Sequence, residues 1–235
     1  MKIEIWSDVV CPFCYISKKN FEKALSKFEH KNRIDVIWRS YELYPNMLTN
    51  PNKTYYEYLA ERDEITVEEV ELLYDFVLEM AQDSGLELNL EKTLILNTKK
   101  AHQLIQVAKT QNLSSEVGEQ LFRACFVENK NIDDIEILQQ IADKTGIVYT
   151  NFSTLLSSKE IINAFSLDIE RSANKEINSV PYFLLNDNVA INGAQDVKVF
   201  TDMLEKAWKN FELDNQGEFE NINGQSCSMD GNCLS

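Results

Sequence analysis

The chain has 235 residues, and its 38 acidic against 23 basic side chains give a formal net charge of −15. Nucleic acids and anionic membrane surfaces are bound mainly through clustered lysines and arginines, so this charge argues against either kind of partner. The length favours one core domain that carries an insertion. Residues 1–8 show no secretory signal, and no later stretch approaches about 18 apolar residues, so we expect a cytoplasmic protein without a membrane span.

The first predicted element is a strand over residues 3–7, where Ile3 and Ile5 alternate with polar or larger neighbours. A helix should follow at once, because Pro12 suits the first helical position, where its missing N–H costs no hydrogen bond. Apolar residues then recur at helical spacing as far as Phe28, which makes Cys11 the N-cap. Residues 33–41 alternate as a second strand, and this order of elements predicts a parallel pair.

Residues 54–176 show only helical periodicity, which predicts an insertion of roughly five or six helices. Residues 182–192 contain two apolar runs around an Asn/Asp turn, a pattern typical of a hairpin. Its two strands complete a sheet of about four strands. Asp196 is expected to cap a last amphipathic helix that ends near Phe211. Residues 212–235 are polar and acidic, and we expect a flexible tail there.

Five cysteines stand at positions 11, 14, 125, 227 and 233. Their odd number and uneven spacing do not suit a disulfide-stapled scaffold. In a reducing compartment such cysteines favour catalysis, redox sensing or metal binding. The motif Cys11-Pro12-Phe13-Cys14 is therefore the first candidate for chemistry.

The start of a helix suits thiol chemistry. A cysteine reacts as its thiolate, and the N–H groups and positive dipole end of a helix N-terminus stabilise that anion. Cys14 lies one turn beyond Cys11 on the same face, so the two sulfurs can close a disulfide. We assign Cys11 as the attacking thiol and Cys14, expected to be the less exposed, as the resolving thiol.

A zinc site is the alternative for such a pair of cysteines. Structural zinc needs four ligands, usually from a second close pair of cysteines or histidines. The remaining candidates do not form a close pair, and they are Cys125, Cys227, Cys233, His30 and His102. This distribution favours redox chemistry and no bound metal.

Val180-Pro181, directly before the predicted hairpin, is the second decisive feature. With it the chain resembles the DsbA-like branch of the thioredoxin superfamily, and within that branch the FrnE-type group, over residues 1–211. The matching segments are Ser7-Asp8-Val9-Val10-Cys11-Pro12-Phe13-Cys14, Asn97-Thr98 with Ala101-His102, Ser179-Val180-Pro181-Tyr182-Phe183 and Ile191-Asn192-Gly193-Ala194-Gln195.

The resemblance implies an α/β, thioredoxin-like fold with a large all-helical insertion. We expect a discontinuous thioredoxin-like domain of residues 1–50 and 177–211, an insertion of residues 51–176, and the tail of residues 212–235. The resemblance also implies that Pro181 follows a cis peptide bond and packs beside the Cys11 sulfur. The backbone of Val180 is then expected to pair with an extended substrate segment.

The implied activity is thiol–disulfide exchange or isomerisation on the disulfides of proteins or peptides. We assign Pro12 and Phe13, with Val180 and Pro181, to substrate binding. No organic cofactor is expected, glutathione is a candidate co-substrate, and the protein is expected to be a monomer or a homodimer.

The residues around Cys11 set its expected redox character. Strong oxidases of this kind stabilise the thiolate by several kcal/mol, whereas a helix terminus alone supplies only about 0.3–2 kcal/mol. Pro12 and Phe13 carry no positive charge, and Asp8 is close enough in sequence to oppose the anion. We therefore expect an intermediate potential and a Cys11 thiol that is partly ionised at neutral pH.

Three assignments outside the motif leave alternatives open. Cys227 and Cys233 are either a second exchangeable pair that relays to the motif, as the resemblance hints, or a passive pair. Cys125 lies on an apolar helical stripe, which favours a buried small residue over a reactive thiol. His102 is either a structural residue of its helix or a modulator of the active site.

Two other functions compete with disulfide exchange. Glutathione transferases of the kappa class and glutathione-dependent isomerases of small aromatic acids have similar folds, but a serine usually stands in the place of Cys11 and no resolving cysteine follows. The presence of Cys14 argues against this reading. A non-catalytic zinc-binding or peptide-binding module is the third alternative.

Overall fold

The computed structural model describes residues 1–212, 220–223 and 227–228, and the chain divides into two compact units. Unit 1 is discontinuous and comprises Met1–Leu43 and Arg171–Ser235, whereas unit 2 comprises Tyr44–Glu170. The insertion expected from the sequence covers residues 51–176, so unit 2 begins and ends a few residues earlier than that.

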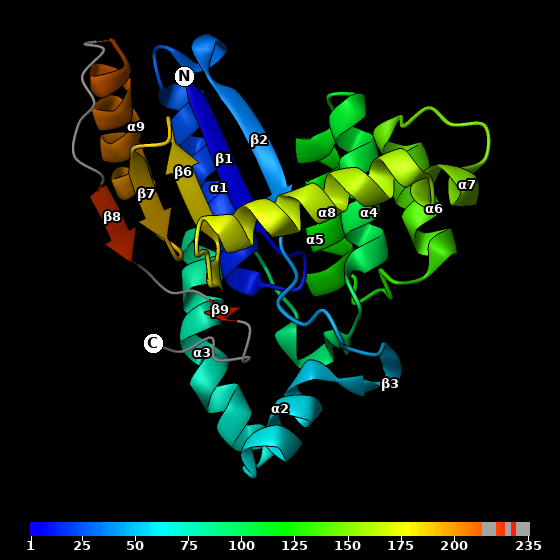
Figure 1. Ribbon diagram of the computed structural model, residues 1–235. Coiled ribbons are helices and arrows are strands. Elements are labelled where there is room, and N and C mark those ends of the chain that lie inside the picture. Colours follow the sequence, from blue (N-terminus) through cyan, green and yellow to red (C-terminus); the bar gives the residue numbers. More distant parts are fainter. Residues whose placement is uncertain (213–219, 224–226, 229–235) are drawn as a thin grey trace. The chain divides into compact units, whose positions relative to one another are not determined.

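Unit 1 contains a five-stranded sheet with the order β2-β1-β6-β7-β8 (Figure 1). Its strands are β1 (Lys2–Ser7), β2 (Asp35–Ser40), β6 (Tyr182–Leu185), β7 (Val189–Asn192) and β8 (Glu220–Asn223). The pair β1–β2 is parallel, as predicted, while β6 runs antiparallel to both β1 and β7. The expectation of four strands is wrong, because β8 adds a parallel strand beside β7 from the segment that we expected to be a flexible tail.

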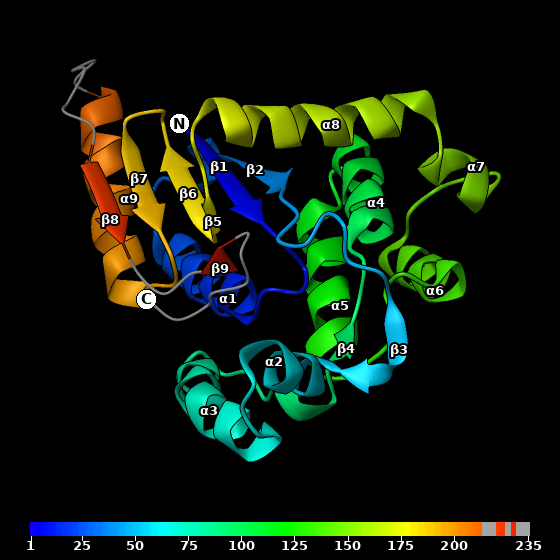
Figure 2. The same ribbon diagram turned by 60° about the horizontal axis from the view of Figure 1, so that its bottom comes forward.

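Helices α1 (Pro12–Lys27) and α9 (Val197–Glu212) lie together on one face of this sheet (Figures 1 and 2). Ile3 and Ile5 alternate along β1 toward this face, where they pack in one apolar cluster with both helices. At its centre the rings of Phe21, Phe183 and Phe200 lie 4.8–5.7 Å apart between centroids. Removing one such buried ring typically costs about 3–5 kcal/mol, so this layer fixes α1 against the sheet.

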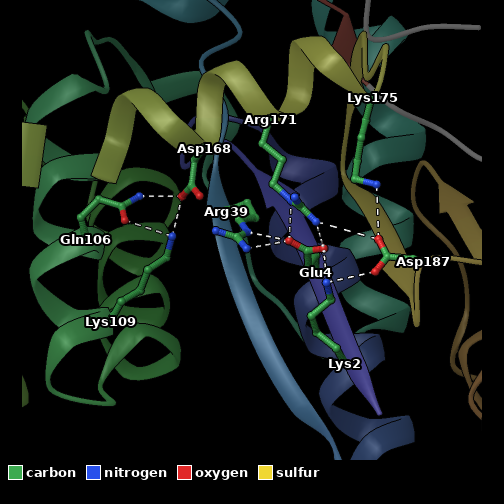
Figure 3. Close-up of polar contacts among 9 residues, drawn as sticks. All are labelled: Lys2, Glu4, Arg39, Gln106, Lys109, Asp168, Arg171, Lys175 and Asp187. Atoms are coloured by element: carbon green, nitrogen blue, oxygen red, sulfur yellow. Dashed lines mark hydrogen bonds and ion pairs between the residues drawn. The ribbon is translucent and has the colours of Figure 1, made fainter. Parts of the chain in front are cut away.

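The opposite face of β1 carries the buried carboxylate of Glu4 (Figure 3). Arg39 on β2 and Arg171 on helix α8 (Lys159–Asn174) each donate two hydrogen bonds of 2.7–2.9 Å to it. Lys2 adds an ion pair at 3.0 Å. Because Arg171 belongs to the second piece of unit 1, these contacts join the two pieces of the discontinuous unit.

The hairpin β6–β7 forms without a glycine in its turn. Asn186 and Asp187 have φ values of 49° and 58°, and Asn188 N–H donates to the Leu185 carbonyl at 3.2 Å. Asn and Asp tolerate the left-handed region better than other residues with side chains, and two such residues give the twist that a tight hairpin needs. The prediction of a hairpin over residues 182–192 is confirmed.

Unit 2 is mainly helical and contains more helices than the sequence suggested. Its helices are α2 (Tyr55–Asp63), α3 (Val67–Asp83), α4 (Lys99–Thr110), α5 (Ser114–Phe126), α6 (Ile135–Thr145), α7 (Phe152–Leu156) and the part of α8 up to Glu170. The insertion is not all-helical, because β3 (Asn50–Thr54) and β4 (Leu94–Ile95) form a two-stranded sheet. Two short 3₁₀ helices lie at Lys31–Arg33 in unit 1 and at Leu90–Lys92 in unit 2.

Local sequence signals explain where two of these helices begin. The side-chain oxygens of Thr54 and Thr66 each cap a helix, and the carboxylates of Glu57 and Glu69 accept hydrogen bonds from the N–H groups of these two threonines. Such reciprocal capping satisfies N–H groups that the helix itself leaves without a partner. Within the described residues, no helix combines the length and the apolar character that a membrane span requires.

Candidate active site

Cys11 and Cys14 lie at the start of α1, as predicted. Cys11 is the N-cap, Pro12 occupies the first helical position, and the N–H of Cys14 donates to the Cys11 carbonyl at 3.1 Å. The N–H of Cys11 donates in turn to the Asp8 carbonyl at 3.1 Å, which fixes the loop between β1 and α1. Both cysteines are in the thiol form. This arrangement directs the N–H groups of the first turn toward the region of the sulfurs.

The two thiols are almost fully buried, with exposed fractions of 0% for Cys11 and 1% for Cys14. The expectation that Cys14 is the less exposed of the two is therefore wrong. Burial, the neighbouring Cys14 and the charge of Asp8 raise the pKa of the Cys11 thiol well above its usual value. The expected partial ionisation at neutral pH is also wrong in this structure, because loss of hydration outweighs stabilisation by the helix N-terminus.

The strand before Pro181 approaches Cys11 from a distant part of the sequence. The Cys11 thiol donates to the carbonyl of Val180 with an Sγ–O distance of 3.7 Å, across 169 residues of chain. Val180 is the second residue of the short strand β5 (Ser179–Val180), and the peptide bond between Val180 and Pro181 is cis, as the resemblance implies. The sulfur of Cys11 thus lies against the backbone to which the resemblance assigns an extended substrate.

Three residues that the sequence analysis did not single out individually hold this loop in place. The N–H of Gly193 donates to the Pro181 carbonyl at 2.8 Å, and Gly193 has a φ of 82°, which favours glycine. Asn192 accepts a hydrogen bond from the Ser179 hydroxyl at 2.9 Å. Asn20 on α1 donates to the Gln195 carbonyl at 2.9 Å. Residues 191–195 were noted only as a matching segment, and nothing in the sequence pattern pointed to Asn20.

Asp8 is buried beside the cysteine motif. Its carboxylate accepts a hydrogen bond from the N–H of Leu43 at 2.7 Å, which ties the end of β1 to the segment after β2. Burial and the Asp8 charge together raise the pKa of Tyr41 to about 12. Asp8 therefore places a negative charge close to both the Cys11 thiol and the Tyr41 hydroxyl.

The side chains assigned to substrate binding are largely covered. Pro12, Phe13 and Val180 are buried, and in the motif segment Val10 is the partly exposed residue next to Cys11. The backbone around Val180, rather than the side chains of Pro12 and Phe13, is therefore the feature that the structure sets beside the sulfur.

Residues 227–228 of the tail form a strand that pairs with the residues before Pro181. Strand β9 (Cys227–Ser228) pairs antiparallel with β5, and its register sets Cys227 opposite Val180. Strands β8 and β9 thus lie in a segment that was expected to be a flexible tail. Cys233 lies outside the described residues.

The other candidate residues belong to unit 2. Cys125 is 1% exposed within α5, as expected of a buried small residue. His102 is fully buried in α4, and its ring lies 6.0 Å from the ring of Phe165 between centroids. Among the residues that the structure describes, no group of three or more His, Cys, Asp or Glu side chains is arranged to hold a metal ion.

Comparison with known families matches residues 2–205 to the DSBA-like thioredoxin domain. A relative from Bacillus subtilis (strain 168), the uncharacterized protein YwbO, is 28% identical over 211 residues, which cover 84% of this chain and 92% of the relative. The match therefore extends through both units.

Solved structures of similar fold cover nearly the whole chain. The probable DsbA oxidoreductase SCO1869 from Streptomyces coelicolor is 26% identical, with a TM-score of 0.82 and coverage of 100% of this chain and 99% of that one. Cytosolic disulfide reductase DsbM from Pseudomonas aeruginosa, in a structure with GSH, is 13% identical, with a TM-score of 0.62 and coverage of 89% and 100%. A 2-hydroxychromene-2-carboxylate isomerase is 15% identical, with a TM-score of 0.63 and coverage of 92% and 98%.

Proposed function

Because the chain belongs to the family of DSBA-like thioredoxin domains, we propose that it is a thiol–disulfide oxidoreductase or isomerase that acts on disulfides of proteins or peptides. The observation that carries this proposal is the position of the Cys11 sulfur, at the N-cap of α1 and 3.7 Å from the carbonyl of Val180. A sulfur at that position can attack a substrate cysteine whose backbone is held by Val180.

In the reducing direction, the Cys11 thiolate attacks one sulfur of the substrate disulfide. A bond forms between Cys11 and that sulfur, and the other substrate sulfur leaves as a thiolate. Cys14 then attacks the Cys11 sulfur, which closes the Cys11–Cys14 disulfide and releases the second substrate thiol. The substrate gains two electrons and the motif loses two, and oxidation of a substrate dithiol is the same sequence reversed.

The environment of Cys11 favours the reducing or isomerising direction. Strong oxidants stabilise their thiolate, which stabilises the reduced form of the motif. Here burial, the neighbouring Cys14 and the Asp8 charge raise the pKa of the Cys11 thiol instead. A thiolate of high energy makes the dithiol a better electron donor, so we propose an intermediate potential that is less oxidising than that of the strong oxidases.

Glutathione is the proposed co-substrate that restores the dithiol. Two glutathione molecules supply the two electrons and leave as glutathione disulfide. The fold of DsbM, named as a cytosolic disulfide reductase and solved with GSH, supports this choice and the cytoplasm as the proposed compartment. The relay between Cys227–Cys233 and the motif stays a prediction, and unchanged turnover after replacing both tail cysteines with serine would remove it.

The proposal is tested by the redox equilibrium of the protein in glutathione buffers, with thiols counted by alkylation and mass. We expect Cys11 and Cys14 to titrate together as a two-electron couple at roughly −150 to −250 mV. Cys125→Ala, which removes a buried thiol in unit 2, should leave the couple in place. Absence of an intramolecular disulfide at every buffer ratio would refute the proposal.

A glutathione-dependent transferase or isomerase is the second candidate, and the fold likeness to 2-hydroxychromene-2-carboxylate isomerase is its support. Cys14→Ser separates the two functions. Disulfide exchange should stop at the mixed disulfide between Cys11 and substrate, because the resolving thiol is absent. An isomerase that uses only the first position would keep its turnover of small aromatic acids in this variant.

A further inference from the structure

The chain returns to its own candidate active site after α9. Strand β8 adds to the sheet beside β7, and β9 then pairs with β5 in the register Ser179↔Ser228 and Val180↔Cys227 (Figure 2). Strand β5 pairs with β9 alone among the described strands. The short strand that ends at the cis peptide bond is thus already paired in the structure.

Val180 has two contacts that matter for exchange. Its carbonyl accepts the Cys11 thiol at 3.7 Å, and its strand partner is Cys227. Residues directly opposite each other in an antiparallel pair have Cα atoms about 4.5–5.5 Å apart, so a second extended chain cannot pair at the same place. Strand β9 of the same chain therefore sets a cysteine opposite Val180, as a substrate would.

We propose that β9 is a built-in occupant of the substrate-binding edge of β5, and that an extended cysteine peptide must displace residues 227–228 before exchange with Cys11. This inference rests on the proposed function, since it concerns the same edge. The paired residues Cys227 and Ser228 are both small and uncharged. Peptides with a small, uncharged residue directly after a cysteine are therefore the competitors that fit best.

A pairing of only two residues would be weak between separate molecules. Because β9 belongs to the same chain, it nevertheless competes well with a free peptide for β5. Strand β8 ends at Asn223 and β9 begins at Cys227, so only three residues separate them. A short tether gives an effective concentration on the order of millimolar. At this effective concentration β9 outcompetes a free peptide of similar intrinsic affinity at micromolar concentration, and the apparent affinity of the peptide falls by the fraction of the protein that is open.

Two truncated chains test the proposal and differ only in the segment at issue. One ends at Gly224 and keeps β8 but lacks β9, and its matched control ends at Asp230 and keeps both strands. We expect the Michaelis constant for an extended cysteine-peptide disulfide to be about fivefold lower in the shorter chain. Hydroxyethyl disulfide, which has no peptide groups to pair with Val180, should be reduced equally fast by both. Equal Michaelis constants for the peptide would overturn the proposal.

Amide hydrogen exchange tests occupancy without relying on activity. In the full chain, the N–H that points toward β5, which is one of the two N–H groups of residues 227–228, should exchange at least about fivefold more slowly than in a free peptide of residues 220–235. Exchange as fast as in the free peptide would overturn the inference. Failure of every chain to reduce hydroxyethyl disulfide would instead refute the proposed function, and hydrogen exchange would still decide whether β9 occupies the edge.

Discussion

The sulfur of Cys11 is subject to opposing influences on its ionisation. The backbone N–H of Cys14, in the first turn of α1, favours ionisation of the Cys11 thiol. Burial opposes ionisation, and so does the carboxylate of Asp8, which also accepts the N–H of Leu43. We therefore expect Asp8 to act as a positioning residue that holds the loop and adjusts the thiol through its charge.

Asp8→Asn separates these two roles. Asparagine keeps an oxygen that can accept the Leu43 N–H but removes the negative charge, so the pKa of Cys11 should fall and the potential of the motif should rise. We expect the rate of alkylation of Cys11 at pH 7 to increase about threefold. Alkylation followed by mass spectrometry across pH 6–10 measures this change.

The matched control is Asp202→Asn, which removes one exposed negative charge from α9. It should leave the alkylation profile of Cys11 unchanged. If Asp8→Asn has no more effect than this control, the Asp8 charge does not act on the thiol.

At the scale of residues, the sequence allowed part of the site to be predicted. The N-cap position of Cys11 follows from Pro12 and the apolar spacing after it, which are local properties. The burial of Cys11, and therefore its raised pKa, does not follow, because it depends on packing with residues such as Val180 that are far away in the sequence. The local sequence pattern therefore predicts which cysteine is reactive, but it does not predict how far that cysteine is shielded from water.

At the scale of elements, α1 carries the sulfur and also anchors the loop after β7. The Asn20 amide donates to the Gln195 carbonyl at 2.9 Å, while Gly193 in the same loop donates to Pro181. One side chain of α1 thus links the helix that holds Cys11 to the turn that holds the cis peptide bond.

Asn20→Ala should loosen this link. A carbonyl that loses its hydrogen-bond partner costs about 1 kcal/mol of the free energy of unfolding, which a urea titration measures. We also expect the rate constant for exchange with a peptide disulfide to fall by roughly a factor of three, because the Val180 backbone is held less tightly against Cys11.

Ser26→Ala is the control on the same helix, since the exposed Ser26 hydroxyl only donates to the Lys23 carbonyl at 2.8 Å. Its stability should stay within about 0.5 kcal/mol of the parent. Equal effects of the two variants on stability and rate would mean that the Asn20 contact has no special role.

The elements that the sequence revealed are those with a strong local pattern. Helix α1, the β6–β7 hairpin and the Asp196 cap of α9, whose carboxylate accepts the Val199 N–H at 2.8 Å, all follow from spacing or turn chemistry. Strands β3, β4, β8 and β9 are short or polar and lack alternation, so only pairing with a distant partner defines them.

At the scale of the whole molecule, unit 1 must hold together two pieces of chain separated by the insertion. The apolar face of its sheet does so with the Phe21, Phe183 and Phe200 rings, and the other face does so with Glu4. Figure 3 shows Arg39 and Arg171 converging on this carboxylate from β2 and α8, with Lys2 and Asp187 beside them. A buried charge is tolerated here because several donors surround it.

The pKa of Glu4 makes this junction dependent on pH. Burial raises that pKa, but hydrogen bonds from Arg171, Lys2 and Arg39 outweigh burial and lower it from 4.5 to about 2. A carboxyl whose pKa is lower in the folded protein stabilises the fold above its unfolded pKa and loses that contribution as the pH falls toward the folded pKa. The stabilising effect of Glu4 is therefore complete at neutral pH and declines between about pH 5 and pH 2.

Glu4→Gln removes the charge while keeping the shape of the side chain, and it leaves two arginines without their anion. We expect the free energy of unfolding at pH 7 to fall by on the order of 3 kcal/mol, and the difference from the parent to shrink to roughly half or less by pH 3. Urea unfolding at pH 7, 5 and 3 measures this, with the exposed Glu205→Gln on α9 as the control. A difference that stays constant from pH 7 to pH 3 would show that Glu4 acts through packing alone and that its charge does not join the two pieces of unit 1.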